Sequence, residues 1–421
     1  MFLLSFLPIL IFLAGSYLLF KTNFFFIFHP IRTLKFAFYR ENRKESFSSL
    51  MLALAGTLGV GNIVGVAIGL KSGGAGSIFW LIFSSLFSSV IKYCEVYLSA
   101  YHKNPNGMIG VIEKSYGESA NFLAKSYATF ALALAFFMGC IFQAEAIKDS
   151  INAKEEVNNA IIIPMLILFT ISICALGKER IKGAVSIIIP IAALIYTVMC
   201  ISVIAMEFNK LPKLIVYITQ QAFKFNSLKG GLLAFIISSG IKEGFARGLL
   251  SNEAGAGTSS FSHTSHYETE IQTQLTKKRI DDAKQAGIFG IIEVFFDTLF
   301  LCPLTAFTIL LTSSLDNFNG TLTEISKIFE THLGKNASVF LIFSVICFAV
   351  STVFCWYYYG KVSFEYIFKR KLKNVYSLCF FITFSVGLIY SVPNVIFITD
   401  TLLFFLSLIS IGTVIKNKNF I

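Results

Sequence analysis

Long apolar runs alternate with short polar segments along the whole chain. A run of about 18 or more apolar residues is long enough to cross the hydrocarbon core of a bilayer as a helix. The runs predict about eleven membrane-spanning helices, at residues 2–20, 47–71, 76–101, 120–148, 158–176, 183–206, 230–262, 280–312, 337–360, 375–391 and 394–415. No two-residue alternation competes with them, so the pattern predicts an all-α membrane protein.

Two further stretches are amphipathic rather than uniformly apolar. The basic segment 27–46 predicts a helix lying at the membrane interface. The segment 211–225 carries Lys213 and Lys224 among apolar residues, and we expect a surface helix on the outer side. Residues 2–20 have no basic segment before them and no small-residue cleavage site after them, so we interpret them as a membrane helix rather than a signal peptide.

The composition agrees with a membrane protein and narrows its class. Hydrophobic residues make up 55% of the 421 residues, charged residues make up 14%, and the mean hydropathy is +0.72. A net charge of +11 is typical of cytoplasmic loops rich in Lys and Arg, so we do not expect nucleic acid as a partner. All eight cysteines fall inside apolar runs, which indicates packing residues rather than disulfides: Cys94, Cys140, Cys174, Cys200, Cys302, Cys347, Cys355 and Cys379.

The distribution of Lys and Arg predicts the orientation. An odd number of helices places the two termini on opposite sides of the membrane. With the N-terminus outside, the cytoplasmic segments carry roughly 22 basic residues and the outer segments roughly 9. Only the segment 207–229, which carries four Lys residues, opposes this choice. We therefore expect a bacterial-type inner-membrane protein with a cytoplasmic C-terminus; the basic clusters placed inside are Arg40–Lys44, Lys178–Lys182, Lys277–Arg279 and Lys369–Lys373.

Two of the predicted helices contain clusters of glycine near their middle. The second helix has glycines within residues 56–62, and the seventh has them within residues 251–257. Each glycine in a helix costs about 1 kcal/mol relative to alanine, so both clusters favour an unwound stretch. Unwound backbone at membrane depth persists only where it is buried in protein or lines a cavity.

The order of the helices predicts an inverted repeat. One extra helix and an interfacial segment occupy residues 1–46. Five helices headed by a broken one then occupy residues 47–206, and five more headed by a broken one occupy residues 207–421. The predicted orientation gives the two groups opposite directions across the membrane. Transporters built in this way bind substrate and coupling ion where the broken helices meet.

A broken helix suits a zwitterion and a cation. The half-helix that begins at the break offers free N–H groups to a carboxylate, and the half-helix that ends there offers carbonyls to an ammonium group or a sodium ion. Close helix packing through small residues is the alternative interpretation of the glycines. A nucleotide-binding loop does not fit, because no strand precedes either cluster.

Polar residues inside apolar runs are costly in a membrane and mark functional sites. The candidates are Gln143, Lys242, Glu243, Arg247, Glu253, Glu293, Asp297, Thr298, Ser351, Thr352 and Trp356. The three residues Lys242, Glu243 and Arg247 form either a structural charge network or a gate, and the sequence leaves this open. Thr352 and Trp356 are four residues apart and therefore share a helix face. We expect them to line a substrate pocket; the alternative is that Trp356 lies at the membrane–water interface.

Two smaller groups receive simpler interpretations. Lys92 and Glu95 lie near the expected inner end of their helix, and we predict that they extend their charged groups to the interface. His263 and His266 have no third ligand in the sequence, so they are weak evidence for a metal site.

Several motifs are similar to those of the alanine/glycine:cation symporter family. They occur in order from about residue 50 to 365, as Gly59-Val60-Gly61-Asn62-Ile63-Val64-Gly65-Val66-Ala67, Gly73-Gly74-Ala75-Gly76-Ser77-Ile78-Phe79-Trp80, Arg247-Gly248-Leu249-Leu250-Ser251-Asn252-Glu253-Ala254-Gly255-Ala256-Gly257, Phe296-Asp297-Thr298, and Ser351-Thr352 with Trp356-Tyr357-Tyr358-Tyr359-Gly360. The chain departs from the family pattern at Ala75, Ile82, Pro303 and Cys355, where the family usually has proline, tryptophan, threonine and glycine. These departures bear on the substrate more than on the fold.

The resemblance implies a leucine-transporter-like fold of five plus five helices with one extra N-terminal helix, and sodium-driven uptake of alanine or glycine. It implies substrate contacts at Gly59, Gly61, Asn62, Gln143, Ser251, Asn252, Ala254, Gly255, Thr352 and Trp356. It places sodium near Gly59, Ser351 and Thr352, and Glu253, Asp297 and Thr298 are the coupling candidates.

The sequence therefore predicts a sodium-coupled importer of a small neutral amino acid that works by alternating access in the lipid bilayer. We expect a monomer with no organic cofactor. The alternatives are a proton-coupled carrier, a carrier of another neutral amino acid such as glutamine, and an ion channel on the same scaffold. An enzyme is not expected, because no nucleophile lies at a suitable spacing from the histidines.

Overall fold

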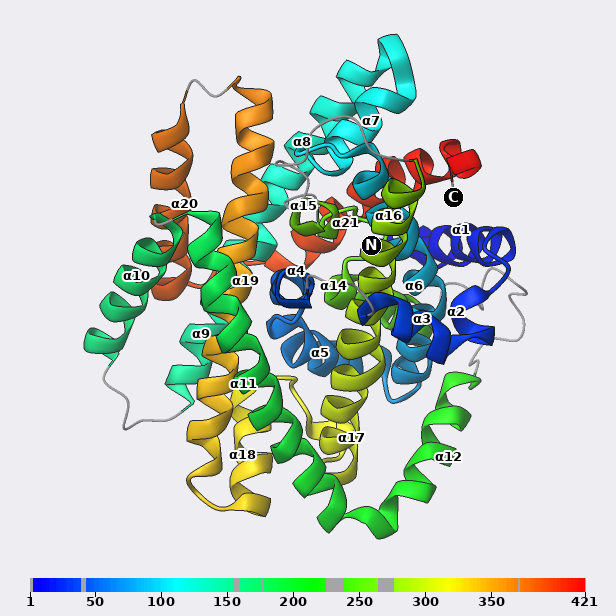
Figure 1. Ribbon diagram of the computed structural model, residues 1–421. Helices are drawn as coiled ribbons and strands as arrows, with labels where there is room; N and C mark the ends of the chain where they lie inside the picture. Colours follow the sequence, from blue (N-terminus) through cyan, green and yellow to red (C-terminus); the bar gives the residue numbers. More distant parts are fainter. Residues whose placement is uncertain are drawn as a thin grey trace.

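The computed structural model describes residues 3–38, 43–153, 159–175, 177–224, 238–263, 276–369 and 372–420. Within these ranges every regular element is helical (Figure 1). The first half of the chain contains α1 (Leu7–Lys21), α2 (Phe25–Phe28), α3 (Pro30–Phe38), α4 (Arg43–Thr57), α5 (Val64–Gly73), α6 (Gly76–His102), α7 (Met108–Tyr116), α8 (Ala120–Phe136), α9 (Gln143–Asn152), α10 (Asn159–Ala175) and α11 (Lys178–Met206). The second half contains α12 (Leu211–Ala222), α14 (Ser239–Asn252), α15 (Ser259–His263), α16 (Thr276–Val294), α17 (Cys302–Thr312), α18 (Leu322–Leu333), α19 (Ala337–Ile367), α20 (Lys373–Ile389) and α21 (Val395–Lys416).

The helices include membrane spans. In the described part of the chain, six are long and apolar enough to cross a bilayer: Gly76–His102, Ala120–Asn152, Gly183–Met206, Arg279–Thr312, Ala337–Ile367 and Val395–Lys416. The bent pair Leu50–Thr57 and Val60–Gly73 makes a seventh span if it is counted as one. Shorter apolar helices are Leu7–Lys21, Ile163–Cys174 and Asn374–Ile389. The chain is thus an all-helical, multi-pass membrane protein, while the count of eleven spans and the five-plus-five repeat stay predictions.

The outer surface suits lipid. Large apolar side chains such as Leu168, Leu194 and Leu378 are more than half exposed on α10, α11 and α20. Figure 1 shows α10 and α20 at one edge of the molecule and α1 at the opposite edge. Side chains of this size would be unfavourable in water but match the hydrocarbon of a bilayer. Inside, α6 packs along both α14 and α16, and α19 packs against α8 and α11.

The first glycine cluster interrupts its span. Helix α4 ends at Thr57, a short 3-10 turn covers Val60–Asn62, and α5 starts at Val64 with its axis bent by 56°. Gly59 has an extended backbone, with φ −106° and ψ −166°. The unwound stretch begins after Thr57, two residues later than the predicted stretch 56–62. Gly56 and Thr57 still belong to the last turn of α4.

The second glycine cluster also ends a helix. Helix α14 stops at Asn252, and the chain resumes a helix only at Ser259. Between them Glu253, Gly255 and Gly257 have φ values of 54°, 97° and 75°. Glycine adopts such left-handed angles without strain, which explains two of the three positions. Glu253 is a non-glycine residue in this conformation, as occurs at strained functional sites.

Two other spans contain π-helical turns that the hydrophobic pattern does not reveal. One covers Phe137–Phe142 between α8 and α9, and the other covers Phe295–Leu301 between α16 and α17. The predicted helices 120–148 and 280–312 are therefore each continuous as a span, Ala120–Asn152 and Arg279–Thr312, but contain a π-helical turn. Gln143 directly follows the first turn, and Asp297 lies within the second. Such turns frequently occur at functional sites because they change the direction of side chains within a helix.

Within the predicted segment 211–225, α12 (Leu211–Ala222) is a helix whose outer face is apolar. In α12, Ile215, Val216 and Tyr217 are exposed. Leu214 and Ile218 pack with Ala75 and Leu311. The helix therefore lies along the bundle near α6 and α17 rather than as an isolated polar surface element.

Candidate functional site

The two broken helices meet near the centre of the bundle. A Cβ atom placed on Gly61 would lie 3.6 Å from the carbonyl oxygen of Leu250, so the first break contacts the last turn of α14. Ser251 Oγ lies 2.7 Å from Asn62 Oδ1 and joins the two breaks directly. Asn62 and Ser251 are 1% exposed, so this junction is closed to solvent.

A cluster of oxygen atoms extends from this junction to α16. Ser251 Oγ lies 2.5 Å from Asp297 Oδ2, and Thr298 Oγ1 donates to the same oxygen at 3.0 Å. Asn252 Nδ2 donates to Thr298 Oγ1 at 2.9 Å. The single proton of the Ser251 hydroxyl can serve only one of its two neighbouring oxygens. We refer to Asn62, Ser251, Asp297 and Thr298 as the oxygen cluster.

The oxygen cluster has the chemistry of a cation site. Asp297 is fully buried, and within the described residues its Oδ1 atom has no hydrogen-bond partner, as is also true of Asn62 Nδ2. A buried carboxylate oxygen without a partner is costly, and a cation would satisfy it. Carboxylate, hydroxyl and amide oxygens are the ligands that hard cations prefer.

A second group surrounds Gly59. A Cβ atom on Gly59 would lie 2.8 Å from Thr352 Oγ1 and 3.4 Å from the Gln143 amide atoms. Gln143 Oε1 accepts a hydrogen bond from the Val60 amide at 3.3 Å. Thr352 Oγ1 is 3.1 Å from the carbonyl oxygen of Ala55, so α19 reaches the carbonyl end of α4. The structure thus brings Gly59, Gln143 and Thr352 together.

Ser351 lies beside this group but bonds within its own helix. Its Oγ donates to the Phe348 carbonyl at 2.9 Å, and Thr352 Oγ1 reaches the same carbonyl at 2.9 Å. The carbonyls of Ala55 and Phe348 and the hydroxyl of Thr352 therefore converge near Gly59. Carbonyl and hydroxyl oxygens of this kind are ligands that hard cations prefer.

The loop after Asn252 faces the opposite way from the oxygen cluster. The Gly255 amide donates to Glu95 Oε2 at 3.0 Å, and the Ala256 carbonyl accepts from Tyr127 at 2.7 Å. The Ala254 amide bonds back to Asn252 Oδ1 at 2.9 Å. Gly255 packs near Ile411 of α21. The structure therefore does not bring Ala254 and Gly255 into one pocket with Gly59 and Gly61.

Trp356 is buried at the second break and is not an interface residue. Its Nε1 donates to Glu253 Oε1 at 3.2 Å, and Thr258 donates to the other oxygen of Glu253. Trp356 and Glu253 are 0% and 1% exposed. The indole therefore helps to hold Glu253 in its left-handed conformation between α19 and the unwound loop.

The prediction that Lys92 and Glu95 reach the interface is wrong. Lys92 and Glu95 are 1% and 2% exposed. Lys92 Nζ lies 2.9 Å from Glu293 Oε2 and donates to the Asn252 carbonyl at 2.6 Å. Burial is possible because each charge has a partner, whereas the apolar pattern around Lys92 carried no information about Glu293.

The histidine at the end of α15 belongs to the same network. His263 Nε2 lies 2.7 Å from Glu293 Oε1, and Ser259 donates to Glu293 Oε2 at 2.9 Å. His266 lies outside the described residues. Among the described residues, no group of three or more His, Cys, Asp or Glu side chains forms a metal site.

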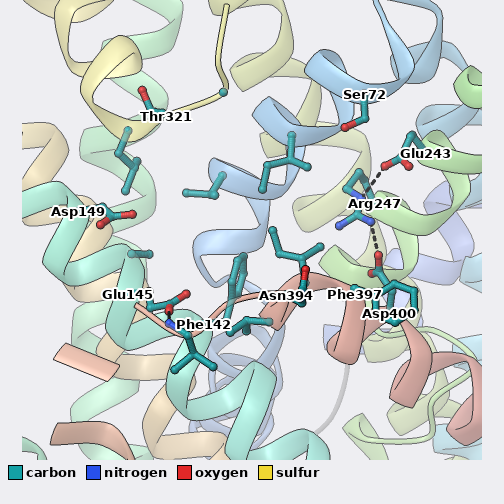
Figure 2. A pocket seen from close by; sticks show the side chains of 18 of the residues that line it. Ser72, Phe142, Glu145, Asp149, Glu243, Arg247, Thr321, Asn394, Phe397 and Asp400 are labelled. Carbon is teal, nitrogen blue, oxygen red and sulfur yellow. Dashed lines mark hydrogen bonds and ion pairs between the residues drawn. The ribbon is translucent and has the colours of Figure 1, made fainter. Parts of the chain in front are cut away.

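A cavity of about 760 Å³ lies between α5, α9, α14 and α21 (Figure 2). Its lining comes from α5, α9, α14, the segment before α18, and α21. On three of these elements the lining residue lies close in sequence to a site residue: Val64 to Asn62, Phe142 to Gln143, and Arg247 to Ser251. Val64, Phe142 and Val395 pack together. All three side chains line the cavity.

The three charged residues left open by the sequence lie in the wall of this cavity. Arg247 forms an ion pair with Asp400 of α21, and its Nε lies 3.3 Å from Glu243 Oε2. Lys242 lines the same wall. The sequence analysis missed Asp400, although an aspartate within the apolar run 394–415 was a signal for it.

Helix α15, which follows the second break, contributes no residue to the lining of the cavity and packs against α4 and α6. The Met108 amide donates to Ser260 Oγ at 2.8 Å, which joins α7 to α15. Ser262 and Tyr359 share a hydrogen bond between α15 and α19. Fully buried side chains thus cover α15, which lies outside the wall of the cavity.

The spans, the interrupted helices and the buried polar centre define a membrane transporter. The family model described as "Sodium:alanine symporter family" matches residues 1–419, and the chain belongs to this family.

Relatives with curated names support the assignment. The Sodium/alanine symporter AgcS of Methanococcus maripaludis is 28% identical over 409 residues, which cover 92% of this chain and 86% of the relative. The "Sodium/proton-dependent alanine carrier protein" of Bacillus sp. (strain PS3) is 26% identical, over 78% of this chain and 75% of the relative. These relatives are carriers rather than enzymes, and the chain is an amino-acid symporter by family.

One solved structure shares the fold. The crystal structure of the Eremococcus coleocola manganese transporter, in complex with an aromatic bis-isothiourea substituted compound, aligns with a TM-score of 0.56. The alignment covers 88% of this chain and 78% of that chain, at 11% sequence identity. The likeness shows the transporter fold and says nothing of the cargo.

Proposed function

We propose that the protein imports a small neutral amino acid, alanine or glycine, by sodium symport across a bacterial-type inner membrane. The observation that carries the proposal is the oxygen cluster at the junction of the two broken helices. It offers a buried carboxylate to a cation at the point where two interrupted helices meet, and transporters of this build bind substrate and ion at such a junction. The names of the family and of AgcS support the same pair of ligands.

The residues divide into two ion sites and one substrate site. One sodium ion binds the oxygen cluster, and a second binds near Gly59, Ser351 and Thr352, where carbonyls of α4 and α19 converge. The amino acid binds between them and contacts Gly59, Gly61, Asn62, Gln143, Ser251, Asn252, Thr352 and Trp356. The predicted contacts Ala254 and Gly255 are left out of this site, because the Gly255 amide bonds to Glu95 and its backbone packs near Ile411. Sodium orders the unwound segments and so raises the affinity for the amino acid, which is positive linkage.

The cavity suggests which state of the transport cycle this is. With the N-terminus outside, the ends of α5 and α14 that line the cavity face the outer side, and α15 faces the cytoplasm. The packed contacts of α15 then form the closed inner gate, and the structure corresponds to an outward-facing state. Rocking of the helix bundle would close the cavity and open the inner side, as alternating access requires.

Proton coupling is the second candidate. Within the described part of the chain, the Glu253 carboxylate accepts hydrogen bonds from the neutral donors Thr258 and Trp356, so this buried carboxylate is a candidate to bind the coupling proton. One relative is named a sodium/proton-dependent carrier. A carrier for a larger neutral amino acid such as glutamine remains an alternative for the substrate.

The test is uptake of radiolabelled L-alanine into proteoliposomes. We expect saturable uptake with an inward sodium gradient and its loss when potassium replaces sodium. Uptake driven by an acid-outside gradient without sodium would shift the coupling to protons. Absence of L-alanine uptake under both gradients would contradict the substrate, and uptake of a panel of neutral amino acids would then identify the cargo.

A further inference from the structure

Arg247 is buried with an incomplete set of partners. Its side chain is 4% exposed, yet it lines the cavity. Nη2 pairs with Asp400, and Nε lies 3.3 Å from Glu243 Oε2. Within the described residues, Nη1 has no hydrogen-bond partner. A guanidinium group presents its N–H donors as a planar fork that fits the two oxygens of a carboxylate, so this group retains an unused half of its recognition surface.

The surroundings hold the guanidinium in the cavity wall, on the helix that ends at the oxygen cluster. A Cβ atom on Gly69 would lie 2.8 Å from Arg247 Cγ, so the absence of a side chain on α5 makes room for the arginine stem. Arg247 is four residues, about one helical turn, before Ser251 of the oxygen cluster. Figure 2 shows Arg247 between Glu243 and Asp400 on one wall, with Glu145 and Asp149 on the opposite wall. A solute in the cavity thus reaches Arg247 one turn before the cluster.

The ion pair has the chemistry to exchange with a zwitterion. An amino acid can give its carboxylate to Arg247 and its ammonium group to Asp400, and both buried charges then remain paired. A carboxylic acid without an amine would leave Asp400 unpaired, and an amine without a carboxylate would leave Arg247 unpaired. Leaving one member of a buried pair without a partner is strongly unfavourable. The pair therefore selects solutes that carry both groups.

We infer that the Arg247–Asp400 pair is an entry site for amino-acid zwitterions, which open the pair by replacing each partner and then move to the central site. The inference rests on the proposed function in that the cargo is an amino acid. The entry site is a station on the path and not part of the final bound state. Its loss should therefore slow binding and release equally and leave the equilibrium affinity of the central site almost unchanged.

Trp356 offers a reporter of the central site. The chain contains two tryptophans, and Trp80→Phe leaves Trp356, which is buried at the second break, as the single one. The experiment mixes L-alanine with this protein in lipid nanodiscs with sodium and follows tryptophan fluorescence by stopped flow. The association rate constant and the equilibrium dissociation constant are compared for the parent, Arg247→Gln, and the control Lys242→Gln, which removes the same charge from the same cavity wall.

In Arg247→Gln we expect association about tenfold slower or more, because charge-assisted hydrogen bonds to the carboxylate are lost, with a nearly unchanged dissociation constant. Lys242→Gln should change the rate less than about twofold, as expected for a screened charge. A pair that only blocks the path gives the opposite result, since its removal speeds association. Faster or unchanged association in Arg247→Gln would overturn the entry site.

A second variant covers the case in which Arg247→Gln does not fold. The double variant Arg247→Gln/Asp400→Asn leaves no unpaired charge at this pair, and we expect the same slow association.

In the parent, propionate and ethylamine should each compete with L-alanine for entry much less than glycine does. Equal competition by all three solutes would contradict zwitterion selection. If the fluorescence of the parent does not respond to L-alanine, the proposed substrate and an entry site for it are both contradicted. If the parent responds and the variants associate with L-alanine at the parental rate, only the entry site is contradicted.

Discussion

Lys92 Nζ lies 2.6 Å from the main-chain carbonyl oxygen of Asn252, at the residue where the second broken helix ends. A fixed ammonium group from α6 thus caps the free carbonyl end of α14, where the helix dipole is negative. The same nitrogen pairs with Glu293 of α16. Lys92 therefore ties three helices together at the break, and it occupies a carbonyl that would otherwise be open to a cation or an ammonium group.

Replacing Lys92 by methionine should destabilise the protein. The change leaves Glu293 buried without its cation, which costs about 3–5 kcal/mol when one partner of a buried pair is removed. Thermal unfolding in nanodiscs, followed by near-UV circular dichroism, measures the loss. Lys71→Met is the control, because Lys71 is exposed at the end of α5. The double variant Lys92→Met/Glu293→Gln should regain part of the stability, and a double variant no more stable than Lys92→Met would contradict a pairwise role.

Gly59→Ala should abolish transport by steric overlap rather than by backbone strain. The φ of −106° is open to alanine, but the new Cβ would lie 2.8 Å from Thr352 Oγ1. Contacts under 3.0 Å force the neighbour to move, and here the neighbour joins α19 to the carbonyl end of α4. Sodium-driven uptake of L-alanine measures the effect. Gly183→Ala is the control, since nothing lies within 4 Å of its Cβ. Normal uptake by Gly59→Ala would show that the space around Gly59 is not required.

Asp297→Asn should weaken sodium coupling. The substitution removes the carboxylate of the oxygen cluster while keeping a side chain of the same shape. Loss of a charged ligand should raise the sodium concentration for half-maximal uptake about tenfold or more, since a hydrogen bond or contact to a charged group contributes about 1.5–3 kcal/mol. Glu253→Gln serves as the comparison, because Glu253 bonds to Thr258 and Trp356 outside the cluster. The reverse pattern, with sodium dependence unchanged in Asp297→Asn and pH dependence altered in Glu253→Gln, would favour proton coupling.

The first turn of α18 should depend on pH. Burial alone would raise the pKa of Glu324, but hydrogen bonds from the Asn319 and Thr321 amides lower it below its ordinary value. A depressed pKa stabilises the turn above the ordinary glutamate pKa, and this stability is lost as the pH falls through the lowered pKa. Hydrogen-exchange protection in Leu322–Leu333, corrected for the intrinsic rate, should therefore fall on acidification. Glu324→Ala, which removes the acceptor, should show low protection at every pH, and protection equal to the parent at neutral pH would contradict the capping role.

The local features of the fold were visible in the sequence because they depend on neighbouring residues. Apolar runs predicted the spans, since the bilayer sets their length. Glycines predicted both interruptions, which the structure places after Thr57 and Asn252, because glycine weakens a helix wherever it lies. The two π-helical turns were not predictable, since a single added residue in a helical turn leaves an apolar run equally apolar.

The partners of buried charges were decided only by the tertiary structure. Arg247 stood out as an ionisable residue in an apolar run, whereas Asp400 was missed, and no local pattern connects two residues that are separated by 153 positions. Lys92 was assigned to the interface because a lysine without a known partner is most stable near water. Packing of α6 against α16 supplied Glu293 and reversed that preference.

The sequence by itself determined that this is a multi-pass helical membrane protein with two interrupted helices, and its motifs led to the family that the comparisons show. These properties follow from composition, spacing and local backbone preference, which act between residues close in the chain. The tertiary structure decided which polar groups meet: Asn62 with Ser251 and Asp297, Gly59 with Thr352, and Arg247 with Asp400. Such contacts depend on how helices cross, and in a bilayer that is set by packing between distant segments rather than by the order of residues along any one of them.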